Sequence, residues 1–359
     1  MESTIELNYS SMKTAIMANV DAIDMTPIMI TGAPGCAKTS VCLDVAESYG
    51  IPRNVAERCI FRPSLRDPVD LAGLPHNERD EDGVLYTHWA ANSFIKYVND
   101  VAAKYGIAFL IVDELPQAVT MMQNALAGLM LDRFVGSNFL HERVFLLSTG
   151  NRVKDKAGAG RIVSQLGNRV EHLPMAVDID AWGKHMIDTY GFDRVGMFVA
   201  YVRFEPGVLE DINPDRMVNG TMRSCTAAAM INPKLPRNIY LAKLAGRIPE
   251  GRAMQFLTFR DLFDELPTAE AMRNTPKTAK LPNGNRGALF AAASLAFKRS
   301  EDEASFNAMA KYVERIATEA LEADIEAFFY KDIMIHKQAL AETNVFIEWA
   351  TGRGAEVLL

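Results

Sequence analysis

The sequence has no long hydrophobic run, few cysteines and no excess of basic residues. No apolar stretch approaches the roughly 20 residues that span a membrane. The start, Met1-Glu-Ser-Thr-Ile-Glu6, lacks the basic and apolar segments of a signal peptide. We therefore expect a cytoplasmic protein without membrane contact.

The absence of a basic excess limits the possible nucleic-acid partners, and the low content of cysteine limits the possible metal sites. A formal net charge of −7 argues against a broad nucleic-acid surface, although a local basic lining would not show in the total. The cysteines form no Cys-x-x-Cys pair and no cluster with histidine at zinc spacing. We expect reduced structural thiols at Cys36, Cys42, Cys59 and Cys225.

The first motif lies in residues 28–42. The apolar run Ile28 to Ile30 predicts a buried strand, a glycine-rich turn follows, and the next residues can begin a helix. In such a loop, glycines let backbone N–H groups wrap a phosphate, the lysine reaches the β- and γ-phosphates, and the threonine holds Mg²⁺. The helix directs its positive end at the anion. The expected ATP-binding residues are Gly32, Ala33, Pro34, Gly35, Cys36, Ala37, Lys38, Thr39 and Ser40, with Thr39 also a Mg²⁺ ligand.

One position departs from the usual phosphate-loop pattern. Ala37 stands where a second glycine is expected before the lysine, and alanine is tolerable there if the residue has helical φ and ψ. The alternative is an ordinary Gly/Pro turn between a strand and a helix. The order of strand, loop, Lys-Thr and helix favours nucleotide binding.

A second motif, Phe109-Leu-Ile-Val-Asp113-Glu114, ends an apolar run in two carboxylates. The run predicts a central parallel strand covered on both faces. In a nucleotide triphosphatase, the first acid, Asp113, helps to hold Mg²⁺, and Glu114 would act as the general base on the attacking water. The alternative is a strand that runs into a polar loop.

A third strand is predicted over Val144-Phe-Leu-Leu-Ser-Thr-Gly-Asn151. Asn151 would orient the water together with Glu114, or it is a turn residue after glycine. Arg161 and Arg169 flank a predicted short helix over 162–168. Either would face a neighbouring subunit, and a surface salt bridge is the alternative for each.

The other segments show less chemistry. Residues 62–90 are irregular and acidic from Glu78 to Asp82, and a hairpin tip is predicted at Asp82-Gly83. From about residue 208 no further strand–turn–helix unit follows. The predicted helices there are 219–231, 236–246, 251–266, 285–298 and 302–347, with a connecting loop over 267–284.

Taken together, these motifs resemble AAA+ ATPases, and more specifically the MoxR branch in the form often carried by bacteriophages. The likeness extends from about residue 26 to 300. It is carried by Gly32-Ala-Pro-Gly-Cys-Ala-Lys-Thr39, Arg66-Asp-Pro-Val-Asp-Leu-Ala-Gly-Leu-Pro75, Asp113-Glu-Leu, Thr149-Gly-Asn-Arg152 and Leu166-Gly-Asn-Arg169-Val-Glu-His-Leu173.

The resemblance implies roles for several residues. Arg169 matches the arginine finger that enters a neighbour's site, with Arg161 as second choice, and Asn151 matches sensor 1. Arg223, in Asn219-Gly-Thr-Met-Arg223-Ser, matches sensor 2, although Met222 and Cys225 replace the family's usual Pro and Trp. Residues 66–90 correspond to a helix-2 insertion that projects toward the ring axis.

The resemblance also implies a fold and an activity. The fold is α/β, a P-loop AAA+ αβα parallel-sheet core followed by an all-α lid. Expected domains are an N-terminal helix (1–25), the core (26–207), the lid (208–300) and a helical extension (301–359). The activity is ATP hydrolysis by a homo-oligomeric ring, usually a hexamer, that remodels a protein client or a von Willebrand A-type partner. For a phage protein, the compartment would be the bacterial host cytoplasm.

Two alternatives come from other classes. A nucleic-acid motor or loader is disfavoured by the net charge of −7 and by the acidic loop at 78–82. An ATP-gated structural switch is disfavoured by Glu114, because switch-type members often lose this carboxylate.

Overall fold

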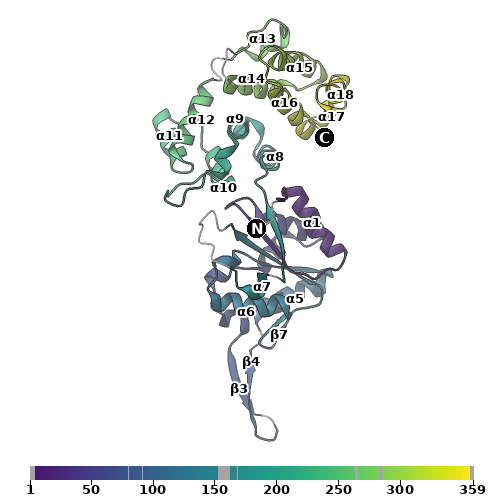
Figure 1. Cartoon of the computed structure of the whole chain (residues 1–359), viewed down its shortest axis with the longest axis vertical. Coiled ribbons are helices and arrows are strands. Elements are labelled where there is room, and N and C mark those ends of the chain that lie inside the picture. Colours follow the sequence, from purple (N-terminus) through teal and green to yellow (C-terminus); the bar gives the residue numbers. More distant parts are fainter. Residues whose placement is uncertain are drawn as a thin grey trace. The chain divides into compact units, whose positions relative to one another are not determined.

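The computed structural model describes residues 5–79, 81–90, 92–152, 162–167, 169–262, 266–282 and 286–355. The chain divides into two compact units (Figure 1). The α/β unit consists of Met1–Asp178 and Ile212–Met217, and the helical unit consists of Ile179–Asp211 and Val218–Leu359.

A parallel five-stranded sheet forms the centre of the α/β unit. A parallel sheet that is covered on both faces needs strands whose residues are all apolar. The strand at 108–112 is such a run, and every one of its residues is buried. The three strands predicted from the motifs are therefore confirmed. In spatial order the strands are β2 (Ile60–Phe61), β5 (Ala108–Val112), β8 (Val144–Asn151), β1 (Ile28–Gly32) and β9 (Glu171–Met175).

Helices and short turns complete the α/β unit. The helix expected within residues 1–25 is present as α1, with Met12, Ile16 and Val20 buried. It packs on α2 and is part of the α/β unit. The elements are α1 (Tyr9–Asp21), α2 (Lys38–Ser48), α3 (Arg53–Ala56), η1 (Glu57–Cys59), η2 (Pro63–Leu65), α4 (Val69–Ala72), α5 (Ser93–Tyr105), η3 (Leu115–Gln117), α6 (Thr120–Leu131) and α7 (Ser164–Gly167).

Two antiparallel hairpins add to this unit. The segment interpreted as irregular contains β3 (Pro75–Arg79) and β4 (Leu85–Trp89), which pair directly and project from the unit in Figure 1. Gly83 has φ +76° between them, so the predicted tip at Asp82-Gly83 is confirmed. The second hairpin joins β6 (Phe134–Val135) to β7 (Asn138–Phe139).

The described residues of the helical unit form helices and the turns between them, and none forms a strand. A single helix predicted over 302–347 is wrong, because Leu321 has φ +60° and the chain turns there. The predicted loop at 267–284 contains a helix capped by Thr268. The elements are α8 (Ile179–Tyr190), α9 (Phe192–Phe204), η5 (Pro206–Glu210), α10 (Met222–Ala229), α11 (Arg237–Ala245), α12 (Glu250–Leu262), α13 (Ala269–Asn274), α14 (Arg286–Arg299), α15 (Glu303–Thr318), α16 (Ala323–His336), α17 (Gln338–Ala341) and α18 (Asn344–Thr351).

The division between the units differs from the predicted boundaries at 207 and 300. Helices α8 and α9 belong to the helical unit because their apolar faces pack there, as in the contact of Phe198 with Phe256, whose ring centroids are 4.8 Å apart. Residues 301–355 are part of the same unit. Arg203 of α9 forms a buried ion pair with Asp332 of α16, which ties the C-terminal helices to α9.

The predicted fold class, a parallel-sheet αβα core followed by an all-α region, is confirmed by these elements. No helix within the described ranges is both long enough and apolar enough to cross a membrane.

Candidate functional site

The candidate site lies at the carboxyl edge of the sheet, where strands β1, β5 and β8 end. Strand register sets which residues meet there, since Gly32 of β1 is paired with Asn151 of β8 and Val112 of β5 with Ser148. Parallel sheets bind ligands at this edge. The phosphate loop and the two predicted acids therefore come from adjacent strands.

Gly32 and Gly35 shape the loop between β1 and α2. A Cβ on Gly32 would lie 2.8 Å from the carbonyl oxygen of Met175 and 2.9 Å from the Cys36 sulfur, so only glycine fits. Gly35 has φ +75°, a conformation that suits glycine. The tight turn brings the backbone of the loop to the N-terminus of α2, which no side chain of the described residues caps.

The condition under which alanine would be tolerable at position 37, a helical conformation, is not met. Ala37 has φ +69° and ψ +25°, which is the left-handed region. A residue with a Cβ pays about 1 kcal/mol or more there, because its Cβ crowds the following carbonyl oxygen. The backbone at Ala37, which stands in place of the second glycine, is therefore strained.

The Lys38 side chain is held by oxygen atoms of the loop and of β8. Its Nζ donates to the carbonyl oxygens of Gly32 at 3.0 Å and Ala33 at 2.8 Å, and to Oδ1 of Asn151 at 3.0 Å. Lys38 is only 9% exposed, so these partners satisfy a buried ammonium. This arrangement places a positive charge directly beneath the glycine-rich loop.

Asp113 and Thr39, the two predicted metal ligands, contact each other. Oδ1 of Asp113 accepts hydrogen bonds from Oγ1 of Thr39 at 2.8 Å and from Oγ1 of Thr149 at 2.7 Å. Carboxylate and hydroxyl oxygens are the donor atoms that Mg²⁺ prefers, so the pair fits this ion. No group of three or more His, Cys, Asp or Glu side chains that could hold a metal occurs among the described residues.

Two neighbours of Asp113 were not assigned a role from the sequence. Thr149 lies in the Ser148-Thr-Gly-Asn151 motif, which pointed to the strand end but not to this hydroxyl. Arg62 follows β2, and its Nε lies 3.4 Å from Oδ2 of Asp113. The local sequence does not indicate the contact of Arg62 with Asp113, because this contact depends on the pairing of β2 with β5.

Glu114 is held in a strained backbone conformation. Its φ of +60° and ψ of +39° are left-handed, and its N–H donates to Oγ1 of Thr149 at 3.1 Å. Such outliers cost roughly 1–3 kcal/mol and cluster at functional sites. Glu114 is exposed and directly follows Asp113 in the chain, so water has access to it.

The remaining predicted residues lie at different places. Arg169 is exposed two positions after the end of α7, in the α/β unit. Arg161 lies outside the described residues. Arg223 is exposed in the first turn of α10 in the helical unit, beside a capping box formed by Thr221 and Ser224. The structure thus brings together Lys38, Thr39, Asp113 and Asn151.

All four cysteines are free and buried, as expected for structural thiols. Burial raises the pKa of the Cys59 thiol to about 11 and that of Cys225 to about 12. Burial, with the Asp113 carboxylate, also raises the pKa of Cys42. These three thiols stay protonated and unreactive at neutral pH.

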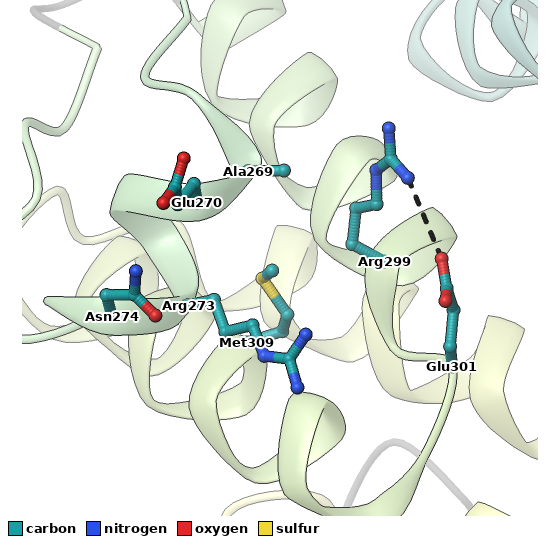
Figure 2. A pocket seen from close by; sticks show the side chains of 7 residues that line it. All are labelled: Ala269, Glu270, Arg273, Asn274, Arg299, Glu301 and Met309. Carbon is teal, nitrogen blue, oxygen red and sulfur yellow. Dashed lines mark ion pairs between the residues drawn. The ribbon is translucent and has the colours of Figure 1, made fainter.

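A pocket of about 470 Å³ lies within the helical unit, on α13 to α15 (Figure 2). It mixes two arginines with two glutamates, and Nη1 of Arg299 lies 3.7 Å from Oε1 of Glu301. The balanced charge gives no preference for a triphosphate, and none of the predicted site residues lines it. The lining residues are Ala269, Glu270, Arg273, Asn274, Arg299, Glu301 and Met309.

Comparisons with known proteins give distant structural matches only. No protein-family model and no curated protein matches the sequence. NtrX from Brucella abortus is 12% identical, with 70% of this chain and 60% of that chain covered and a TM-score of 0.36. The chain therefore spans about 60% of the length of that NtrX structure.

Two further solved structures align over most of this chain. C. elegans PCH-2 is 15% identical, with coverages of 90% and 70% and a TM-score of 0.31. The replication initiator DnaA, bound to AMPPCP and single-stranded DNA, is 13% identical, with coverages of 92% and 92% and a TM-score of 0.30. TM-scores this low indicate only distant likeness, and the proposed function is based on the geometry of the site.

Proposed function

We propose that this chain is an AAA+ ATPase of the MoxR type, which binds ATP between the subunits of a homo-oligomeric ring and remodels or activates a protein partner. The observation that carries the proposal is the meeting of Lys38, Thr39 and Asp113 beside a glycine-rich loop at the carboxyl edge of a parallel sheet. This combination is what phosphoryl transfer from a nucleotide requires.

The loop fits a triphosphate. Gly32 leaves no room for a side chain, and the uncapped N-terminus of α2 directs N–H groups at an anion. Lys38 would exchange its contacts with carbonyl oxygens for β- and γ-phosphate oxygens. The nucleotide would lie over residues 32–40, and Arg223 is the proposed sensor 2 residue.

Thr39 and Asp113 would hold Mg²⁺. When bound, Mg²⁺ neutralises charge on the β- and γ-phosphate oxygens. Thr149 donates to Asp113 at 2.7 Å and so fixes the direction of that carboxylate. The hydroxyl therefore acts as a positioning group for the proposed metal ligand.

Hydrolysis needs a water that is oriented and deprotonated. Glu114 would accept its proton, since the carboxylate is exposed next to the proposed metal ligand. Asn151, which contacts Lys38, would bond the water or the γ-phosphate. The exposed side chain of Arg169 is available to a neighbouring subunit, as a finger acting in trans requires, with Arg161 as the second candidate. A head-to-tail contact of this kind closes into a ring, proposed to be a hexamer.

The β3–β4 hairpin supports a protein partner over a nucleic acid. It carries Glu78 in β3 and Glu81 and Asp82 in the turn, and these carboxylates repel a phosphate backbone. Apolar side chains are exposed along its second strand and beside it, a pattern typical of protein contact sites. These are Leu74, Val84, Leu85, Tyr86 and Trp89, with Phe134 and Phe139 of the neighbouring hairpin.

The hairpin is anchored firmly at its base. The Asn92 N–H donates to Oδ1 of Asn138 at 2.7 Å, and Nδ2 of Asn138 donates to the Ala72 carbonyl oxygen at 3.1 Å. Oγ of Ser137 donates to the carbonyl oxygen of Trp89 at 3.0 Å. A rigid base would transmit a movement of the core to a bound client.

The test is the ATP hydrolysis rate per subunit as a function of protein concentration, with Arg169→Ala measured alongside. A shared site predicts a rate that rises steeply with concentration and is lost in the variant. Arg58→Ala, which removes another exposed arginine of the α/β unit, is the matched control. A flat rate that Arg169→Ala leaves unaltered contradicts a site completed by a neighbour.

A further inference from the structure

Arg62 lies next to the proposed metal carboxylate because of strand pairing. Phe61 of β2 is in register with Val112 of β5, and the N–H of Asp113 donates to the carbonyl oxygen of Phe61 at 2.8 Å. The residues that follow each strand, Arg62 and Asp113, therefore leave the sheet side by side. Their side chains meet with Nε of Arg62 at 3.4 Å from Oδ2 of Asp113.

The two oxygens of Asp113 have different partners. Oδ1 accepts the hydroxyls of Thr39 and Thr149, whereas Oδ2 faces the Arg62 guanidinium. The aspartate side chain is 14% exposed and the arginine side chain is 51% exposed. The acid is thus held by two hydroxyl groups, while the arginine approaches it from the solvent side.

We propose that Arg62 is a built-in counter-ion that competes with a divalent cation for Asp113. A metal bound by Thr39 and Asp113 needs the negative charge that the guanidinium neutralises. Binding of the metal would displace Arg62, so this residue sets the metal affinity of the site. Arg62 is a positioning residue, because it acts through Asp113.

The inference deepens the proposed function and depends on it for the identity of the ion, Mg²⁺ with a nucleotide. The competition itself is a property of the nucleotide-free chain. The effect is modest because the guanidinium is half exposed, and exposed ion pairs change an equilibrium by up to about fivefold. Salt would reduce the effect further, since it screens exposed charges.

The experiment is a titration of the nucleotide-free full chain with Mn²⁺ alone, followed by electron paramagnetic resonance. Arg62→Gln is expected to bind Mn²⁺ two- to fivefold more tightly than the wild type at low salt. Arg62→Lys, which keeps the charge, should restore the weaker binding. Arg66→Gln removes an equal charge from the same segment and should leave the affinity unchanged.

The background variant Asp113→Asn locates the effect. There, Arg62→Gln should no longer alter Mn²⁺ affinity, because the competed carboxylate is gone. Equal Mn²⁺ affinity in Arg62→Gln and wild type, or no Mn²⁺ binding by either, would overturn the inference. Thermal unfolding of each variant tests whether the substitution of an exposed arginine leaves the chain folded.

Nucleotide binding separates this inference from the proposed function. Binding of AMPPCP is measured on the same proteins. A wild type that binds no AMPPCP, together with tighter Mn²⁺ binding by Arg62→Gln, contradicts the ATPase proposal and supports the competition. AMPPCP binding in EDTA that weakens in Arg62→Gln would mean that Arg62 contacts the nucleotide directly, and the counter-ion role would be wrong.

Discussion

The Nζ of Lys38 lies 3.0 Å from Oδ1 of Asn151, which joins the first helical residue after the phosphate loop to the end of strand β8. The contact depends on the pairing of Gly32 with Asn151 in adjacent strands. Replacement of this amide contact by a phosphate would release Asn151. This hydrogen bond thus links the Lys38 side chain to β8, in addition to the backbone pairing of β1 with β8.

Lys38→Ala is expected to abolish ATP binding, because it removes the charge beneath the loop. Equilibrium binding of a fluorescent ATP analogue measures this loss. Lys96→Ala, on the exposed face of α5, is the control and should bind like the wild type. Retention of binding in Lys38→Ala, with a normal melting temperature, would contradict the phosphate-loop assignment.

Glu114→Gln is expected to bind ATP but to hydrolyse it at least about 100-fold more slowly, the usual effect of losing a general base. The isosteric amide keeps size and polarity while it loses the proton acceptor. Single-turnover hydrolysis measures the chemical step, and analytical ultracentrifugation with ATP measures whether the assembly is trapped. Hydrolysis at the wild-type rate would show that Glu114 is not the base.

Inactive subunits are expected to complement each other if Arg169 acts in trans. Arg169→Ala retains its own loop, and Lys38→Ala retains its own arginine, so a mixed ring contains some complete sites. The measurement is the ATPase rate of mixtures whose composition is confirmed by mass spectrometry. No recovery in confirmed mixed rings would argue against Arg169 as the finger and direct attention to Arg161.

Ala37→Gly is expected to stabilise the chain by about 1 kcal/mol, because glycine adopts the left-handed conformation without a Cβ penalty. Urea unfolding measures the change in the free energy of unfolding. Ala46→Gly in α2 is the control with opposite sign, since glycine inside a right-handed helix costs about 1 kcal/mol. Destabilisation by Ala37→Gly would contradict the strained backbone.

The buried imidazole of His336 is expected to make the folded chain less stable in acid. Burial, together with Arg203 and Lys184, lowers the pKa of His336 from its ordinary value of 6.5 to about 4. The unfolded chain therefore takes up a proton at a higher pH than the folded chain does. The stabilisation is fully present above pH 6.5 and is lost as the pH falls toward 4.

Unfolding of the wild type and of His336→Leu at pH 6.5 and pH 4.5 tests this prediction. The stability of the wild type relative to the variant should fall by about 2 kcal/mol between these values. Asp332 titrates nearby, since burial raises its pKa to about 6, and the comparison cancels its contribution to first order. An equal pH dependence of both proteins would contradict the role of His336.

The sequence by itself determined the chemical parts of the candidate site and much of the α/β core. Gly32, Lys38 and Thr39 follow one apolar run and Asp113 follows another. Local physics suffices for these features, because a buried strand needs an unbroken apolar run, and a tight turn next to a helix needs glycine. The tip of the β3–β4 hairpin was likewise predictable from Asp82-Gly83.

Only the tertiary structure decided which side chains meet. The contacts of Arg62 and Thr149 with Asp113 depend on strand register, which pairs residues far apart in the chain. The assignment of α8, α9 and residues 301–355 to one helical unit depends on packing such as the buried pair of Arg203 with Asp332. A single sequence records which residues are apolar or charged, but the partner of each is set by long-range pairing, and local patterns do not contain it.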